Sequence, residues 1–184
     1  MHRRRFVQAG LVLPAGLMLA GRALALTPAC RDAAPGTPRQ TEGPFYTPQT
    51  PRKASLVEPD AGGTARIVLA GLVLTPGCRP VANAMLDFWH ADDKGEYDNA
   101  GFRYRGHLYA DAQGRYRVES IVPGLYPGRA RHLHVKVGAP GRRPLTTQLY
   151  FPGDASNAPD RLYRPELQMK RDGAAMRFDF VIDA

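Results

Sequence analysis

Short segments with the length and composition of β-strands fill the sequence after residue 63, and turn sequences separate them. The sequence Asp-Ala-Gln-Gly at residues 111–114 separates two of these segments as a hairpin turn, and Thr-Pro-Gly-Cys at 75–78 ends another. No segment keeps a helical period over 12 residues, and only 160–168 is expected to form a short helix. The expected strands are 65–74, 85–90, 106–110, 115–120, 131–137, 145–151 and 176–182.

This pattern predicts an all-β protein, an antiparallel β-sandwich of about seven strands with an extended N-terminal arm. The length of 184 residues suits one domain. Residues 26–63 are rich in Pro, Thr and Gly and show little periodicity, so they are expected to form the arm. The adjacent rings of Phe45 and Tyr46 suggest that the arm packs on the sandwich, which we expect to span residues 64–184.

The N-terminus has the features of an export signal over residues 1–25. Basic residues precede a 12-residue apolar run at 9–20, and Ala-Leu-Ala at 23–25 forms a cleavage site. The run is too short to span a bilayer. Arg3-Arg4-Arg5 suggests the twin-arginine route, although an ordinary secretory signal with a chance arginine cluster is the alternative. We therefore expect an exported protein, periplasmic or extracellular.

Removal of this segment would lower the formal net charge of the chain. Residues 1–25 carry four arginines and no acidic residue, so the formal net charge of +8 falls to +4. The remaining arginines are scattered along the chain and do not form a stripe. The composition therefore gives no support to a nucleic-acid partner.

Two cysteines, Cys30 and Cys78, remain after the predicted cleavage site. An even pair in an exported protein suggests one disulfide. Lipid attachment at Cys30 is the alternative, although Thr27 and Pro28 suit a lipoprotein signal poorly.

His132 and His134 are two residues apart in an expected strand, with Tyr126 six residues upstream. This spacing places both imidazoles on one face, roughly 6.6 Å apart along the strand. Imidazole suits iron, copper and zinc, whereas a tyrosinate ligand would favour Fe(III), because a phenol needs a highly charged cation to stay ionised at neutral pH. The alternative is a pair of histidines that face solvent.

Several further motifs occur in a fixed order between residues 40 and 154 and include a tyrosine-bearing loop. They are Thr-Glu-Gly-Pro-Phe-Tyr at 41–46, Phe-Trp-His-Ala at 88–91, Gly-Glu-Tyr at 95–97, Asp-Ala-Gln-Gly-Arg-Tyr at 111–116, Pro-Gly-Leu-Tyr-Pro at 123–127, His-Leu-His at 132–134 and Thr-Gln-Leu-Tyr-Phe-Pro-Gly-Asp at 147–154. With these motifs the chain resembles the intradiol ring-cleavage dioxygenases, the protocatechuate and catechol dioxygenases, and especially their small exported members.

The resemblance implies a non-haem Fe(III) held by two tyrosinates and two histidines, which are Tyr97, Tyr126, His132 and His134 in this sequence. It also implies an enzyme that inserts both atoms of O₂ into a catechol-type aromatic diol. The ring opens between the two hydroxylated carbons and gives a muconate-type diacid, and Tyr126 is the ligand expected to leave when the diol binds.

Two polar residues are expected to assist this reaction. Arg129 lies where family members carry an active-site arginine, and a fixed cation there would stabilise negative charge that develops on the substrate. Arg131 is the competing candidate. Gln148 lies where the family places a glutamine near the metal.

The sequence departs from better-known family members in two ways. Only five residues separate Tyr126 from His132, so part of the wall over the pocket is absent, and the chain lacks the length for the helical N-terminal domain of catechol dioxygenases. These differences leave the choice of aromatic diol open, and the oligomeric state is open as well.

Two alternatives from other classes remain at this point. The turn motifs at 111–116 and 123–126 also occur in transthyretin-like sandwiches that bind no metal, which would make the protein a non-catalytic binding module. An exported copper or zinc carrier could use His132 and His134 alone. His90 and His107 are expected to be structural.

Overall fold

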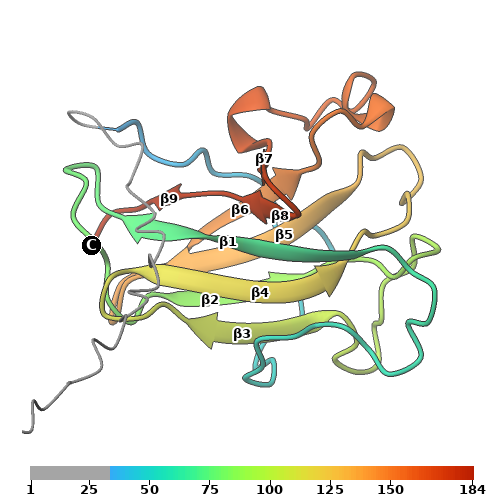
Figure 1. The fold of residues 1–184 in the computed structure, drawn as a ribbon, viewed down its shortest axis with the longest axis horizontal. Helices are drawn as coiled ribbons and strands as arrows, with labels where there is room; N and C mark the ends of the chain where they lie inside the picture. The colour runs from blue at the N-terminus through green and yellow to red at the C-terminus, as the bar shows by residue number, and fades with distance from the viewer. Residues whose placement is uncertain (1–33) are drawn as a thin grey trace, which may run out of the picture.

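The computed structural model describes residues 34–184, which contain nine β-strands and two single-turn 3₁₀ helices (Figure 1). The predicted export signal and Cys30 lie outside the described residues, so the signal and the Cys30–Cys78 disulfide stay predictions. The elements are β1 (Arg66–Leu74), β2 (Met85–Trp89), β3 (Arg105–Tyr109), β4 (Arg115–Ile121), β5 (His132–Gly138), β6 (Leu145–Tyr150), η1 (Ala155–Asn157), η2 (Pro165–Leu167), β7 (Lys170–Asp172), β8 (Ala175–Arg177) and β9 (Phe180–Val181).

The strands form two sheets that pack face to face, which confirms the predicted β-sandwich (Figure 1). One sheet has the order β4-β1-β8-β7, with β9 also paired to β1, and the other has the order β3-β2-β5-β6. All pairs are antiparallel except those of β1 with β8 and with β9.

The core lies between the sheets and is built by alternation along each strand. Leu86 and Phe88 of β2 and Leu133, Val135 and Val137 of β5 point inward and are almost fully buried. The intervening residues of the same strands therefore point to the outer face of the β3-β2-β5-β6 sheet. That face carries both histidines of the candidate metal pocket.

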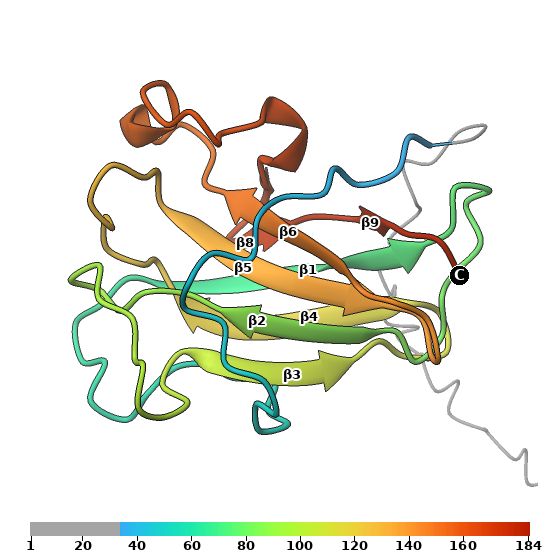
Figure 2. The same ribbon diagram turned by 180° about the vertical axis from the view of Figure 1, so that it is seen from behind.

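The N-terminal arm covers this outer face. In Figure 2 the arm passes in front of β6, β5 and β2 before it reaches β3. The backbone N–H of Gln40 donates to Thr146 of β6 (2.9 Å), and that of Lys53 donates to His107 of β3 (3.0 Å). The arm side chains of Tyr46 and Thr50 donate to the buried carboxylate of Asp87 on β2. The outer face is thus a second buried layer.

The first six expected strands are found within about one residue of their predicted ends, but the C-terminal region differs. Residues 176–182 contain two short strand segments, β8 and β9, because the ladder with β1 is interrupted at Phe178 and Asp179. The strand β7 was not predicted. The carboxylate of Asp179 accepts a hydrogen bond from the backbone N–H of Leu72 (2.9 Å) at this break. The helix expected at 160–168 is wrong, since only Pro165–Leu167 forms a 3₁₀ turn.

Within residues 34–184, no helix is long and apolar enough to cross a membrane.

Gly71 of β1 allows the chain break that separates β8 from β9. A methyl group on Gly71 would overlap with the carbonyl oxygen of Phe178. We therefore expect Gly71→Ala to lower the free energy of unfolding by about 1–3 kcal/mol in urea denaturation, as overpacked sites do. Gly62→Ala is the matched control, because nothing lies within 4 Å of the added methyl group. Equal stability of the two variants would contradict this account.

Candidate metal centre

The candidate ligands gather at one end of the β3-β2-β5-β6 sheet. The strand register aligns Trp89 of β2, His134 of β5 and Gln148 of β6 in one row across its outer face. His132 lies two residues before His134 and pairs with Tyr150. The loop after β2 carries Tyr97, and the loop before β5 carries Tyr126 and Arg129.

Three of the four predicted ligands place their donor atoms together. The Nε2 atoms of His132 and His134 are 3.0 Å apart, and the hydroxyl oxygen of Tyr97 is 3.3 Å from Nε2 of His132. Two ligands that bind one metal ion at about 2.1 Å with an angle of roughly 90–110° have donor atoms about 3.0–3.4 Å apart. The observed separations therefore match donors that share one ion.

Both imidazoles are held in the neutral form that binds metals. Burial lowers the pKa of His132 to about 4, although a hydrogen bond from Nδ1 to the carbonyl of Ala130 (2.6 Å) opposes this shift. Because Nδ1 carries the proton, Nε2 presents its lone pair to the site. Burial and the neighbouring His132 lower the pKa of His134 well below its ordinary value.

One polar atom of His134 has no hydrogen-bond partner in this arrangement. Its ring stacks on Trp89, with centroids 4.8 Å apart and an interplanar angle of 9°. Its Nδ1 is buried and has no hydrogen-bond partner among the described residues. Its Nε2 meets only the electron-rich Nε2 of His132. A buried imidazole with so few partners costs free energy, and a cation bound between the two Nε2 atoms would offset that cost.

The two tyrosines are connected through aromatic contacts. Phe45 of the arm stacks on Tyr97 with ring centroids 4.5 Å apart, and Tyr126 lies edge-on to both rings, at 5.9 Å from Tyr97 and 5.5 Å from Phe45. Tyr126 is half-buried, and its hydroxyl makes no hydrogen bond within residues 34–184. The structure thus brings Tyr126 beside Tyr97 but gives it a looser setting.

The phenol of Tyr97 is neutral unless a strong cation binds it. Burial raises the pKa of Tyr97 above its ordinary value, and the guanidinium groups of Arg129 and Arg105 only partly oppose this effect. A tyrosinate at this position therefore requires a highly charged metal ion such as Fe(III).

The chemistry of the donor set fits iron. The described part of the chain contains no group of three or more His, Cys, Asp or Glu residues that could hold a metal ion. A metal held by His132 and His134 would complete its coordination with other donors, and the Tyr97 hydroxyl is in place 3.3 Å from Nε2 of His132, with Tyr126 beside Tyr97. Two imidazoles and two phenols together suit Fe(III), and the residues present would hold it.

Arg129 points toward this centre and Arg131 points away from it. Nη2 of Arg129 donates to Oε1 of Gln148 (2.6 Å), and its Nε donates to Asp160 (3.0 Å). Arg131 instead donates to the carbonyl of Pro123 and pairs with Asp154 (2.8 Å). Both arginines precede β5, and Arg129 belongs to a turn in which its backbone N–H donates to the carbonyl of Tyr126 (3.0 Å).

Sequence reasoning missed several residues that position this centre. The hydroxyl of Tyr150 lies 2.9–3.1 Å from oxygen atoms of Gln40, Gln148 and Leu162 and can donate to one of them, and Asp160 is 7% exposed and fixes Arg129. Tyr150 belongs to the motif at 147–154 and could have been found there. Asp160 lies in a segment without periodicity and gave no signal.

Arg105 is a further missed residue, and it lies under the loop that carries Tyr97. It is fully buried, and its guanidinium donates to the backbone carbonyls of Asp98 (2.6 and 3.0 Å) and Phe45. One carbonyl belongs to Phe45 itself, and the other belongs to Asp98, which directly follows Tyr97. Arg105 therefore joins the tyrosine loop to the arm.

The remaining histidines have structural contacts, as predicted. His90 is buried and contacts Ser120 Oγ (2.6 Å) and the carbonyl of Ala91 (2.7 Å). Nδ1 of His107 lies 2.8 Å from the carbonyl of Thr50 of the arm. Tyr116 belongs to the core. Trp89 is fully buried, between Tyr46 of the arm and His134.

The matches to known proteins agree with this site. A family model described as "Dioxygenase" matches residues 41–184. The chain belongs to this dioxygenase family. The solved and curated relatives within it are intradiol dioxygenases, which confirms the resemblance drawn from the motifs.

Individual relatives cover the dioxygenase chain to different extents. The sequence is 33% identical over 144 residues to catechol 1,2-dioxygenase 2 of Acinetobacter lwoffii. This alignment covers 65% of this chain and 52% of the relative. It is 35% identical over 132 residues to the protocatechuate 3,4-dioxygenase beta chain of Burkholderia cepacia, covering 61% of this chain and 56% of the relative. The chain thus spans about half the length of these curated relatives.

A solved structure matches nearly end to end. It is the dioxygenase domain of a dioxygenase–carbohydrate-binding protein fusion from Streptomyces sp. SirexAA-E, with 46% identity, 81% of this chain and 99% of that chain covered, and a TM-score of 0.76. The catechol 1,2-dioxygenase of Pseudomonas arvilla C-1 matches with 29% identity, 79% of this chain and 62% of that chain covered, and a TM-score of 0.68.

The buried His90 predicts a pH dependence of stability in this dioxygenase. Burial lowers the pKa of His90 from 6.5 to about 4. Between these values the unfolded chain binds a proton that the folded chain does not, so stability falls as the pH falls from 6.5 toward 4, by up to about 1.4 kcal/mol per pH unit for this group. Urea denaturation of the metal-free protein at several pH values measures this slope. We expect His90→Asn to give a shallower slope than wild type, and parallel curves would contradict the assignment.

The hydrogen bonds of Arg105 lead to a prediction about how the loop that carries Tyr97 is held in place. Arg105→Met leaves the buried carbonyls of Asp98 and Phe45 without donors, which should lower the free energy of unfolding by about 2–4 kcal/mol. Near-UV circular dichroism should also show a loss of the stacked Phe45–Tyr97 pair. Arg103→Met is the matched control, because the exposed Arg103 side chain pairs with Asp60 and lies over the ring of Tyr104 but donates to neither carbonyl, so the stacked pair should be unchanged. A native near-UV spectrum in Arg105→Met would show that the arginine does not hold the stack.

Proposed function

We propose that this chain is a non-haem Fe(III) intradiol dioxygenase that cleaves a catechol-type aromatic diol with O₂. The observation that carries the proposal is the convergence of Tyr97, His132 and His134, with Tyr126 beside them, in a chain of the dioxygenase family. The cleavage between the two hydroxylated carbons would give a muconate-type diacid.

Tyr97, Tyr126, His132 and His134 would hold the iron. Bound Fe(III) would supply a Lewis acid for the two oxygens of the diol and make the ring reactive toward O₂. The two histidines are buried, and the Tyr97 hydroxyl lies 3.3 Å from Nε2 of His132, so these three residues suit permanent ligation. Tyr126 is half-buried like Tyr97, but its hydroxyl makes no hydrogen bond within residues 34–184, so it suits the ligand that is displaced.

Tyr126 would also take up a proton. A catechol that binds as a dianion loses two hydroxyl protons; a phenolate at Tyr126 would be a base for one of them, and the other would pass to solvent water. The half-exposed position of Tyr126 would give its protonated phenol room to turn away. This role would explain why the hydroxyl of Tyr126 makes fewer contacts than that of Tyr97.

Arg129 and Gln148 would act on the substrate. The ion pair with Asp160 fixes the Arg129 guanidinium, and Gln148 is fully buried and adjacent to His134 in the strand register. A preorganised cation beside the metal stabilises negative charge that appears on the ring during the reaction. Because Arg129 is held by protein groups, it requires no rearrangement at that moment.

The metal assignment predicts colour and composition. The purified protein should hold about one iron per chain and show visible absorption from tyrosinate-to-Fe(III) charge transfer. Tyr97→Phe and His134→Ala should lose this band and most of the iron, measured by absorption and elemental analysis. Tyr104→Phe is the control, because Tyr104 packs against Ile121 away from the centre. A colourless, iron-free wild type would favour the non-catalytic sandwich, and copper or zinc binding that survives Tyr97→Phe and Tyr126→Phe would favour the carrier.

The different contacts of Arg129 and Arg131 predict that catechol binding can be separated from ring opening by mutation. Arg129→Leu should keep the iron and the anaerobic binding of catechol but lower the rate of ring opening by about 10²–10³, as the loss of one charge-stabilising group does. Arg131→Leu is the matched control and should turn over at nearly the wild-type rate. The assay is anaerobic catechol binding followed by O₂ addition and detection of a muconate. The reverse result for the two variants would mean that Arg131 is the active-site arginine.

We also propose that the protein is exported and that Cys30 and Cys78 pair in the oxidising compartment. The support is the sequence of residues 1–25 and the even cysteine count. Mass spectrometry of material from the periplasm or medium tests both points, since it reports the mature N-terminus and the number of free thiols.

A further inference from the structure

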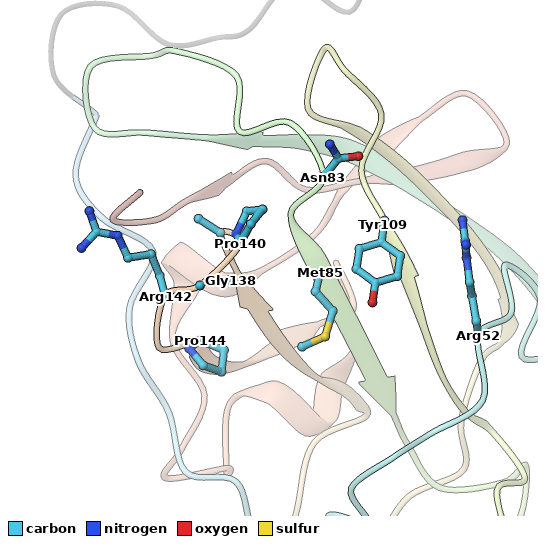
Figure 3. A pocket seen from close by; sticks show the side chains of 10 residues that line it. Arg52, Asn83, Met85, Tyr109, Gly138, Pro140, Arg142 and Pro144 are labelled. Atoms are coloured by element: carbon cyan, nitrogen blue, oxygen red, sulfur yellow. The ribbon is translucent and has the colours of Figure 1, made fainter.

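A second pocket lies on the same outer face, at the other end of the β3-β2-β5-β6 sheet (Figure 3). Its volume is about 580 Å³, which is in the range of small-molecule sites. The residues that line it come from three strands, two turns and the arm. They include Arg52, Met85, Tyr109, Gly138, Arg142 and Pro144.

The strand register builds the floor of this pocket. Tyr109 of β3 pairs with Met85 of β2, and Met85 pairs with Gly138 of β5, so the three residues form one row. Gly138 contributes no side chain to the row, which leaves the hollow beside Met85. A methyl group there would crowd Pro144, at 3.0 Å from its Cα atom. The hollow is therefore bordered by Met85, a proline and the ring of Tyr109.

The arm adds a cation to the aromatic ring. The arm forms a β-bridge between Arg52 and His107, and the backbone N–H of His107 donates to Pro51 (3.0 Å). This pairing places the Arg52 guanidinium over the ring of Tyr109, 5.3 Å from its centroid. Figure 3 shows Tyr109 between Met85 and Arg52. Tyr109 is 44% exposed, so the ring can still contact a ligand.

The pocket carries positive charge that no acidic residue neutralises. Arg52 and Arg142 line it, no Asp or Glu does, and neither arginine forms an ion pair with another residue of the described range. Arg142 lies on the turn after β5, on the opposite side of the pocket from Arg52, with its guanidinium turned outward (Figure 3). A guanidinium group binds a carboxylate through two parallel hydrogen bonds, so the pocket suits an anion with that geometry.

This pocket is separate from the metal centre. Gly138 lies four positions after His134 along β5, which is about 13 Å in a strand. The intervening row contains Asp87 and Lys136 and is covered by Tyr46 of the arm. A ligand in the pocket therefore cannot touch the metal ligands.

We propose that this pocket binds a planar aromatic carboxylate. The aromatic ring of the ligand packs on Tyr109, Met85 and Pro144, and its carboxylate pairs with an arginine. The inference does not rest on the proposed ring cleavage, because none of these residues belongs to the metal centre.

Calorimetric titration of the iron-loaded protein tests this site. Cinnamate is the probe, since it is a planar aromatic carboxylate without the paired hydroxyls of a catechol, and cinnamamide is its neutral counterpart. Cinnamate should bind, and cinnamamide should bind at least about tenfold more weakly. Arg142→Met and Tyr109→Ala should each weaken cinnamate binding by about tenfold. Arg115→Met, which removes an exposed arginine of β4, should leave it unchanged.

Three outcomes would overturn the proposal. Equal binding of cinnamate and cinnamamide would mean that the arginines do not select the ligand. Undiminished binding to both Arg142→Met and Tyr109→Ala would place the ligand elsewhere. Loss of binding in His134→Ala, with normal binding in the two pocket variants, would place cinnamate at the metal centre. The last result would leave the proposed dioxygenase activity untouched.

Discussion

The register between β2, β5 and β6 is the constraint on which the rest of the site depends. It aligns Trp89, His134 and Gln148 on the outer face of a sheet whose inner face is the sandwich core. A slip of one residue in β5 would turn both histidines into the core and Leu133 and Val135 out of it. The apolar inner face therefore fixes the position of the imidazoles, and stability and metal binding share one cause.

Burial under the N-terminal arm sets the protonation states of these side chains. An uncovered outer face would leave the histidines in water with ordinary pKa values, whereas burial lowers the pKa of His132 to about 4 and raises that of Tyr97. The arm brings Phe45 to Tyr97 and Tyr46 to Trp89. Burial thus prepares neutral imidazoles and disfavours a free phenolate, so that only a strong Lewis acid ionises the tyrosine. The arm is part of the site and not an appendage.

Much of this could be predicted from the sequence, for reasons that are local. Alternation and turn residues set the ends of β1 to β6, and the spacing of His132 and His134 placed them on one face. What could not be predicted depends on contacts between distant segments. The break at Phe178 requires Gly71, Arg129 is fixed by Asp160, and Trp89 stacks on His134 where the arm covers both. The different contacts of Arg129 and Arg131 depend on the fold of the loop before β5, which the sequence pattern does not reveal.

The central claim is that two phenols and two imidazoles at one end of the outer face share one iron ion. X-ray diffraction from crystals of the iron-loaded protein, recorded at the iron absorption edge, locates that ion directly. The account predicts a single anomalous peak within bonding distance of Tyr97, Tyr126, His132 and His134. A peak bound by other residues, or one that contacts the histidines but neither tyrosine, would contradict it.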